Sequence, residues 1–155
     1  MSVGTDRDQL LLELDTARAR VMDAISGLSE DQMSRPDIDG WSVKDHLNHL
    51  TACDEFRFLE ILRVSRGGQA GFTGFWGEQS DFLNDLVVTQ RRKLPLAQVV
   101  SDLQVTREFV IQAITAAPNE ALRSERYVMY PVNGSIPHEI GHAKTITSWR
   151  EKEGI

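Results

Sequence analysis

Apolar residues recur at every third or fourth position along most of this chain, a spacing that predicts α-helices. The first stripe consists of Leu10, Leu14, Ala17, Val21, Ile25 and Leu28. Thr5 stands before the stripe as a candidate helix cap, and Asp8 follows as an acidic residue of the first turn. A first helix is therefore expected to begin after Thr5 and to bury one of its faces.

A second helix is expected to begin after Ser42, a candidate cap with Asp45 in the first turn, and to end near Arg66. This segment carries two apolar stripes on different sides. One contains Val43, Leu47, Leu50, Phe58 and Ile61, and the other contains His49, Ala52, Phe56 and Leu59. Because a helix with two apolar faces packs against two neighbours, we predict an inner helix with an enclosed His49.

The second half of the chain predicts three further helices. The expected segments are 78–90 for a short helix, Pro95 to Pro118 for a long one, and Ser135 to Lys152 for the last. No pair of segments has the alternation of a strand pair. Four long helices and one short additional helix predict an all-α protein, a four-helix bundle that forms a single domain over residues 1–155.

Two connecting segments carry aromatic residues. Residues 67–77 contain five glycines together with Phe72, Phe75 and Trp76, which predicts a glycine- and aromatic-rich loop. These aromatic side chains form either a lid or docking surface or the end of the core. Tyr127 and Tyr130 lie in an irregular link before the last helix, where they either line a site or pack.

Composition limits the functions to be considered. The net charge of −6 argues against a nucleic acid or an anionic membrane as partner, because both attract basic surfaces. The single cysteine, Cys53, cannot form an internal disulfide. The N-terminal residues are too polar for a signal peptide, and no apolar run approaches ~18 residues. We therefore expect a cytoplasmic protein.

All four histidines fall within 46–49 and 138–142. His138 and His142 are spaced i, i+4, so both imidazoles project from one face of a helix. Two neutral nitrogens held in this way can bind one divalent ion, and a third histidine from another helix would leave a coordination position open. This layout is typical of a catalytic metal site. The alternative is that His138 and His142 are surface residues whose spacing arose by chance, and that His46 and His49 are core residues or caps.

The last histidine pair also satisfies H-E-x-x-H, the zinc motif of metalloproteases. The elongated form of that motif requires a glycine and a histidine at two positions where this chain has Thr145 and Ser148. No later glutamate is well placed to be a ligand, and no strands are available to line a substrate groove. A third ligand must then come from His46 or His49, and helical geometry alone does not choose between them.

The segment Gly-Trp-Ser-Val-Lys-Asp-His-Leu-Asn-His-Leu, residues 40–50, resembles the second-helix signature of the DinB-like superfamily. In that signature Trp-Ser or Trp-Thr starts the helix and a His-Leu pair ends the motif. His138 and His142 are similar to the other half of that family's site, and the shared pattern covers nearly the whole chain. The resemblance implies a bundle of the DinB or maleylpyruvate isomerase type with a three-histidine metal site. The implied ligands are His49, His138 and His142, so that His49 is chosen over His46 by the family pattern.

The resemblance also implies a range of functions. The family includes transferases and isomerases that use low-molecular-weight thiols, hydrolase-like members and stress-associated proteins. Glu139 lies beside the histidine pair and is either a general base or a partner that orients an imidazole, or else a solvated glutamate of the first turn. Asp45 either caps its helix or orients His49. Cys53 is read as a small apolar residue and is left out of the catalytic set.

Three functions follow from these readings. The first is a metal-dependent enzyme that acts on a small molecule. It is either a transferase that uses a low-molecular-weight thiol or a hydrolase. The second is a non-catalytic metal-binding protein of stress response or interaction, and the third is a metal-free binding module. Zinc or nickel is the expected ion, although imidazole also binds copper and iron. The helices with two apolar sides are also compatible with a homodimer.

Overall fold

The computed structural model describes residues 7–69, 71, 80–123 and 134–155, and within these residues the chain forms seven helices and no strands. The helices are α1 (Arg7–Ile25), α2 (Glu30–Ser34), α3 (Val43–Ser65), α4 (Ser80–Arg91), α5 (Leu96–Ala116), α6 (Asn119–Arg123) and α8 (Ser135–Glu153). The predicted all-α class is confirmed. None of the described helices is long and apolar enough to cross a bilayer.

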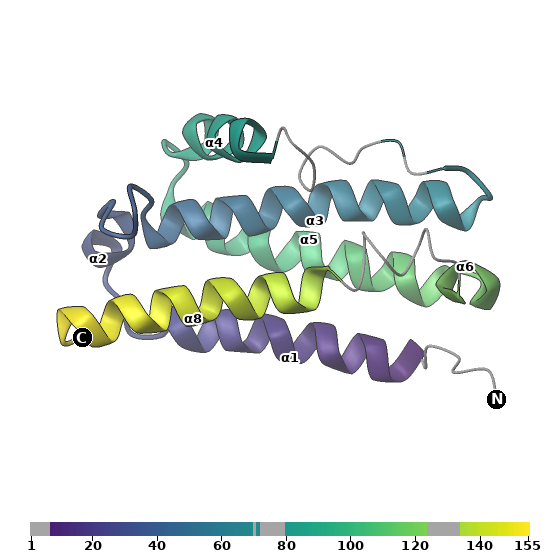
Figure 1. Cartoon of the computed structure of the whole chain (residues 1–155), viewed down its shortest axis with the longest axis horizontal. Helices are drawn as coiled ribbons and strands as arrows, with labels where there is room; N and C mark the ends of the chain where they lie inside the picture. Colours follow the sequence, from purple (N-terminus) through teal and green to yellow (C-terminus); the bar gives the residue numbers. More distant parts are fainter. Residues whose placement is uncertain (1–6, 70, 72–79, 124–133) are drawn as a thin grey trace.

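The four long helices α1, α3, α5 and α8 lie side by side (Figure 1). α1 and α8 run in one direction, and α3 and α5 run in the other. The closest helix pairs are α1 with α8 and α3 with α5, and α4 packs on the outer side of α3. α3 therefore has neighbours on two sides, as its two apolar stripes predicted.

Local sequence signals explain where α3 begins. The hydroxyl of Ser42 accepts a hydrogen bond from the backbone N–H of Asp45, and the Asp45 carboxylate accepts one from the backbone N–H of Ser42. These reciprocal bonds form a capping box that satisfies backbone donors at the start of the helix. The predicted capping roles of Ser42 and Asp45 are confirmed.

Replacement of Ser42 by alanine is expected to lower the free energy of unfolding by ~1 kcal/mol, because the N–H of Asp45 loses its acceptor in a buried position. Urea unfolding followed by circular dichroism measures the change. The exposed Ser101→Ala in α5 serves as the control and is expected to change the free energy by less than ~0.5 kcal/mol. Equal effects of the two substitutions would contradict the capping role.

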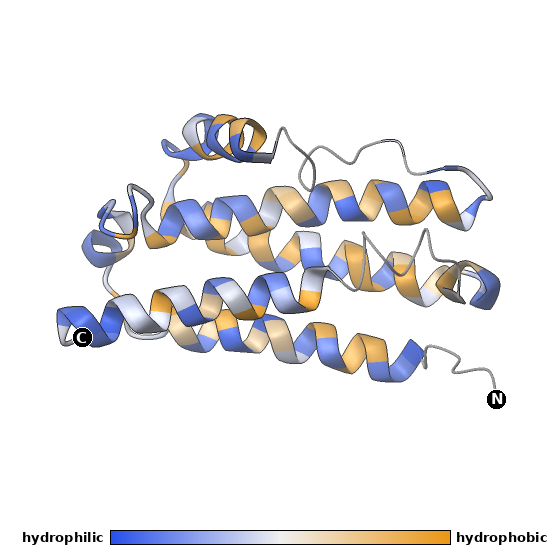
Figure 2. Cartoon of the chain, viewed as in Figure 1, coloured by the Kyte–Doolittle hydropathy of each residue, from blue (hydrophilic) through white to orange (hydrophobic). Residues whose placement is uncertain are grey.

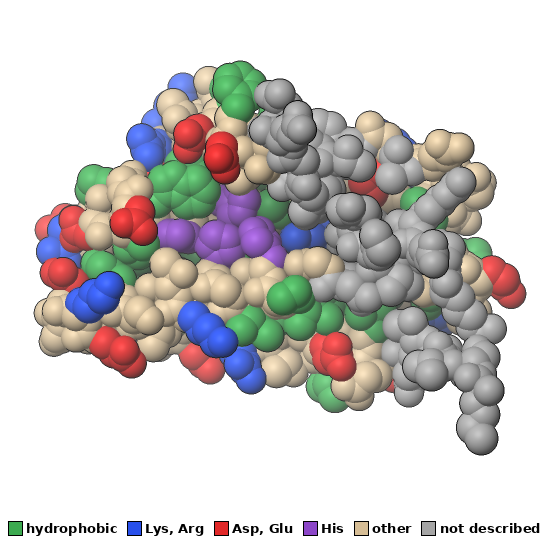
Figure 3. Space-filling view, in the orientation of Figure 1, with side chains coloured by type: hydrophobic (Ala, Val, Ile, Leu, Met, Phe, Trp, Pro, Cys, Tyr) green, Lys and Arg blue, Asp and Glu red, His purple; other side chains and the backbone are tan. Residues whose placement is uncertain are grey.

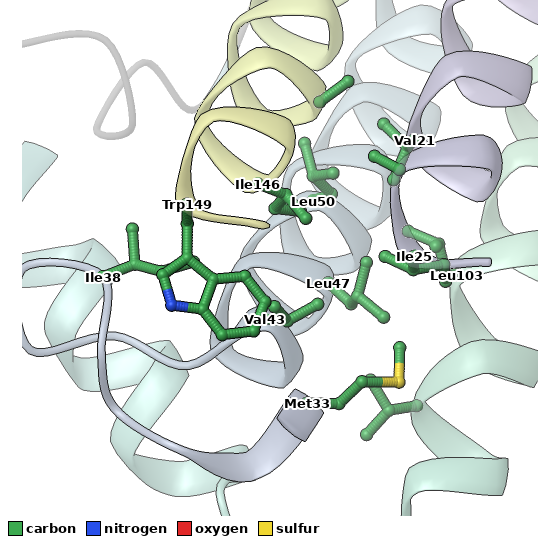
Figure 4. Packing of buried hydrophobic residues seen from close by; sticks show 13 residues of the cluster. Val21, Ile25, Met33, Ile38, Val43, Leu47, Leu50, Leu103, Ile146 and Trp149 are labelled. Carbon is green, nitrogen blue, oxygen red and sulfur yellow. The ribbon is translucent and has the colours of Figure 1, made fainter. Parts of the chain in front are cut away.

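The interior of the bundle has two apolar layers with a charged layer between them. The first apolar layer contains Val21 and Ile25 of α1, Leu47 and Leu50 of α3, Leu103 of α5 and Ile146 and Trp149 of α8. The other contains Leu10 and Leu14 of α1, Ile61 and Val64 of α3, and Val110 and Ile114 of α5. Figure 4 shows part of the first layer, in which side chains of α1, α3 and α8 meet.

Buried charged residues separate these two apolar layers. They are Arg18 of α1, Asp54 and Arg57 of α3, Arg107 of α5 and Glu139 of α8. On α1, for example, Arg18 follows Leu14 by one turn and precedes Val21 by another. Coloured by hydropathy, α8 is polar along most of its length (Figure 2), which fits a helix that brings charge and histidines into the bundle.

Most members of the predicted stripes are buried, and one is not. Leu10, Leu14, Ala17, Val21 and Ile25 are all buried. Leu59 is 44% exposed, so its prediction as a packed residue of the second stripe is wrong. α4 covers the α3 surface around Ala52 and Phe56, and the stripe extends beyond the part that α4 covers.

Several predictions fall outside the described residues. The cap at Thr5 is one of them. The aromatic residues Phe72, Phe75 and Trp76 and the link residues Tyr127 and Tyr130 are the others. These remain predictions from the sequence.

Candidate metal centre

The structure brings all four histidines together from two helices that are distant in sequence. His46 and His49 lie one turn apart on α3, and His138 and His142 lie one turn apart on α8. The ring centroids of His49 and His138 are 4.9 Å apart, and those of His46 and His142 are 5.0 Å apart. Figure 3 shows the histidines as one contiguous patch on the face of the bundle between α3 and α8.

His138 approaches both His49 and His142 through the same ring atom. Nε2 of His138 lies 2.9 Å from Nε2 of His49 and 3.1 Å from Nε2 of His142. Two nitrogens bound ~2.1 Å from one ion, with ~90–110° between the bonds, would be ~3.0–3.4 Å apart. The two observed separations, from His138 to His49 and from His138 to His142, are close to that range.

Cys53 joins this group, which the sequence prediction did not foresee. The ligand atoms of His49, Cys53 and His138 all lie within 4.8 Å of one another, so this buried group could hold a metal ion. Sγ of Cys53 is 3.8 Å from Nε2 of His49, because the two residues are one turn apart on α3. Cys53 is fully buried, and burial raises the pKa of its thiol to about 11. In the absence of an ion this thiol is therefore protonated at neutral pH.

The four imidazoles are neutral at physiological pH. Burial is the main cause: together with the repulsion that a protonated His142 would exert, it lowers the pKa of His46 to about 3 and that of His49 to about 2. Burial, the charge of His142 and Arg57 lower the pKa of His138 to about 3. The pKa of His142 is about 4, again mainly through burial. Unprotonated nitrogens are what a metal ion requires.

These depressed pKa values make the metal-free protein sensitive to acid. The unfolded chain binds protons at its histidines below pH ~6.5, whereas the folded chain does not, so stability is lost as pH falls through that value. Each histidine can change the free energy of unfolding by up to ~1.4 kcal/mol per pH unit below that value. Between pH ~7.5 and ~5 in the presence of a chelator, we expect urea unfolding to report a loss of at least ~2 kcal/mol.

The double variant His138→Gln and His142→Gln provides the comparison for this pH series. It is expected to retain roughly half of the pH dependence, because two of the four titrating rings are gone. The Glu139 carboxylate changes the free energy of unfolding in a separate, lower pH range, since its ordinary pKa lies below that of histidine. An identical slope in both proteins would show that the histidine cluster is not the source.

His46 makes a different contact from the other three histidines. Its Nδ1 lies 2.7 Å from Nδ1 of His142. Its Nε2 is buried and has no hydrogen-bond partner within the described part of the chain. The indole of Trp41 packs against the rings of both His46 and His49, with centroid distances of 5.2 and 5.4 Å. His46 and His49 are thus both in the cluster, and each enters it through a different ring atom.

Glu139 is fully buried in the charged layer, so its prediction as a solvated glutamate is wrong. Its carboxylate accepts hydrogen bonds from Arg18 and Arg107, including one of 2.9 Å from Nε of Arg18. Burial alone would raise the pKa of Glu139, but the hydrogen bond from Arg18 and the charge of Arg107 bring the pKa below its ordinary value. The carboxylate is ionised and engaged by two guanidinium groups. The general-base role stays a prediction.

The remaining charged-layer contacts link the same helices. Asp54 accepts a hydrogen bond of 2.9 Å from Arg18 and one of 3.1 Å from Arg57. Nη2 of Arg57 in turn lies 3.5 Å from Nδ1 of His138, where the charged layer meets the histidine cluster. Three guanidinium groups and two carboxylates give this layer one excess positive charge.

The sequence reasoning did not identify this layer. A signal was present, because Arg18 and Arg107 each occupy a position of an apolar stripe, one turn after Leu14 and Leu103 respectively. Charged residues at such positions must be paired when they are buried. The pairing partners come from other helices and cannot be read from one stripe.

Comparison with known proteins relates this arrangement to a family. The sequence profile described as the DinB superfamily matches residues 13–146, from α1 to most of α8. A crystal structure of an uncharacterised protein from Escherichia coli UTI89 superposes with a TM-score of 0.78 at 16% sequence identity, over 96% of this chain and 95% of that chain. At this identity the likeness concerns the fold. No curated protein matches the sequence.

Proposed function

Because this chain belongs to the DinB superfamily, we propose that it is a metal-dependent enzyme that acts on a small molecule, as a thiol S-transferase or a hydrolase. In this proposal His49, His138 and His142 hold a divalent ion, zinc or nickel, and leave a coordination position open. A divalent ion with an open position supplies Lewis-acid activation of a thiol or a water molecule.

The observation that carries this proposal is the approach of three Nε2 atoms to within 2.9 and 3.1 Å along a path from His49 through His138 to His142. His138 and His142 are only partly buried, so the cluster can be reached from outside. Figure 3 shows this accessible face.

In this proposal the residues around the cluster keep the ligands in place. Glu139 does not contact the three nitrogens but is held by Arg18 of α1 and Arg107 of α5. Since Glu139 immediately follows His138 on α8, these hydrogen bonds fix the rotation of α8 and hence the direction of its two histidines. We therefore assign Glu139 a positioning role and leave proton transfer to the substrate or solvent.

Elemental metal analysis of untagged protein tests the proposal. Wild-type protein reconstituted with zinc or nickel is expected to retain about one ion per chain. The double variant His138→Ala and His142→Ala is expected to retain none while remaining helical by circular dichroism. The loaded wild type is then assayed with electrophiles in the presence of small thiols, and with ester and amide substrates in their absence. The proposal would be contradicted if the wild-type protein retained no ion.

A second candidate function, a metal-binding protein without catalysis, is favoured by Cys53. When a thiolate sulfur lies ~2.3 Å and an imidazole nitrogen ~2.1 Å from the same ion, a sulfur–metal–nitrogen angle of ~120° places the two ligand atoms ~3.8 Å apart. This is the observed Sγ to His49 Nε2 distance of 3.8 Å. With Cys53 as a fourth ligand the ion would be closed off, as in structural sites.

Cobalt substitution separates these two functions. A bound thiolate gives an intense near-ultraviolet charge-transfer band, whereas a set of three imidazoles and water does not. We expect no such band in the wild type and an unchanged visible spectrum in Cys53→Ser. A band that disappears in Cys53→Ser would favour the closed, non-catalytic site. Self-association into a homodimer stays a prediction, to be measured by sedimentation on the same samples.

A further inference from the structure

The fourth histidine of the cluster, His46, contacts the proposed ligand His142 and not the proposed position of the ion. Its Nδ1 lies 2.7 Å from Nδ1 of His142, whereas His142 approaches His138 through Nε2. The two nitrogens of His142 therefore point to two different residues, Nε2 to the proposed ion position and Nδ1 to His46.

We infer that His46 is a positioning residue that accepts a hydrogen bond from Nδ1–H of His142 and so holds that ring with Nε2 toward the metal. The inference rests on the proposed three-histidine site. It assigns the two histidines of α3 different tasks, with His49 as a ligand and His46 as the acceptor behind another ligand.

Proton placement supports this assignment. A neutral imidazole carries one proton, so it donates from one nitrogen and accepts at the other. When Nε2 of His142 gives its lone pair to an ion, the proton must sit on Nδ1, which then donates to Nδ1 of His46. His46 in turn must carry its own proton on Nε2. The reverse arrangement, in which His46 donates to His142, would place the His142 proton on Nε2 and block that atom as a ligand.

Among the residues that the structure describes, no side chain competes with His142 for a hydrogen bond to the ring of His46. Within the described residues, its Nε2 is buried without a partner, and His142 provides the hydrogen-bonding contact of its Nδ1. Trp41 packs edge-on against the ring at 5.2 Å. The nearby Asp45 carboxylate is engaged by the backbone N–H of Ser42 and by Arg92. The ring is therefore held in the orientation that presents Nδ1 to α8.

Metal-bound histidines commonly donate their second N–H to a carboxylate, a carbonyl or water, and loss of that partner typically lowers metal affinity 10–100-fold. Here a neutral imidazole takes that place. A neutral acceptor fixes the tautomer and orientation of His142 without adding negative charge behind the ligand.

Two substitutions at position 46 test this role. His46→Leu keeps a buried side chain of similar bulk but removes the acceptor, and His46→Asn keeps an acceptor oxygen near the position of Nδ1. We expect zinc affinity, measured by competition with a chromogenic chelator, to fall ~10–100-fold in His46→Leu and to recover most of the loss in His46→Asn. Both variants are expected to bind about one zinc ion per chain at saturation.

Nitrogen-15 spectra of histidine-labelled, zinc-loaded wild type give a readout that folding defects do not affect. We expect His142 to be protonated at Nδ1 and His46 at Nε2, with zinc-shifted Nε2 signals for His49, His138 and His142. A zinc-shifted nitrogen on His46, or loss of stoichiometric binding in both position-46 variants, would make His46 a ligand and overturn the inference.

Two other results would also overturn the inference. If His46→Leu bound zinc as tightly as the wild type, the acceptor would be irrelevant while the three-histidine site would stand. If the wild type bound no zinc or nickel, the proposed site itself would fail, and the role of His46 would fail with it. The wild-type binding measurement therefore separates failure of the site from failure of its positioning residue.

Discussion

Replacement of Glu139 by glutamine is expected to lower the free energy of unfolding by ~3–5 kcal/mol. The carboxylate accepts hydrogen bonds from Arg18 and Arg107 in a buried layer. Glutamine has nearly the same shape, but its amide carries no charge and turns an N–H₂ group toward guanidinium donors. Three buried guanidinium groups would then be balanced by a single carboxylate, that of Asp54.

Urea unfolding at neutral pH, followed by circular dichroism, measures this loss. Glu151→Gln is the matched control, because it makes the same chemical change at an exposed position of the same helix. It is expected to alter the free energy by less than ~0.5 kcal/mol. If Glu139→Gln cost no more than this control, the charged layer would not stabilise the bundle.

Replacement of His138 by alanine is expected to reduce zinc affinity more than ~100-fold, beyond the effect of removing a partner behind a ligand. His138 is the middle member of the cluster, since its Nε2 contacts the Nε2 atoms of both His49 and His142. Removing it leaves one proposed ligand on each helix, His49 on α3 and His142 on α8.

Titration with zinc in competition with a chelator measures the change in affinity. Lys144→Ala, at an exposed position of α8, is the control and should bind zinc as the wild type does. His49→Ala is expected to match His138→Ala, because both remove a proposed ligand. Retention of near-wild-type affinity in His138→Ala would show that the ion, if any, is held elsewhere.

The helices and their caps could be predicted from the sequence because their signals are local. The spacing of Leu10, Leu14 and Val21 and the pair Ser42 and Asp45 each lie within a few turns of one segment. The same locality explains why His138 and His142 were expected to share a face. The third ligand was expected to be His46 or His49 because the chain has no other histidines, and the family resemblance only chose His49. The structure brings the two histidine pairs together.

The charged layer and the part played by Cys53 were not predicted, because both depend on contacts between helices. Glu139 has the sequence context of an ordinary first-turn glutamate, and only the approach of Arg18 and Arg107 shows that it is buried. Cys53 is one turn from His49, but the position of His138 is what makes the three a group that could bind metal. Partners from distant segments leave no pattern in a single stretch of sequence.

The pairing of Arg18 with Glu139 also affects the order in which the chain can fold during synthesis. The two residues are separated by 121 positions, and His49 and His138 by 89. At ~5–20 residues per second, the ribosome releases α1 many seconds before α8 is made. Until then the guanidinium of Arg18 lacks one of its two carboxylates, and α1 lacks the helix it packs against most closely. The native bundle therefore closes only after α8 has been made, whereas α3 and α5 can pack against each other before that.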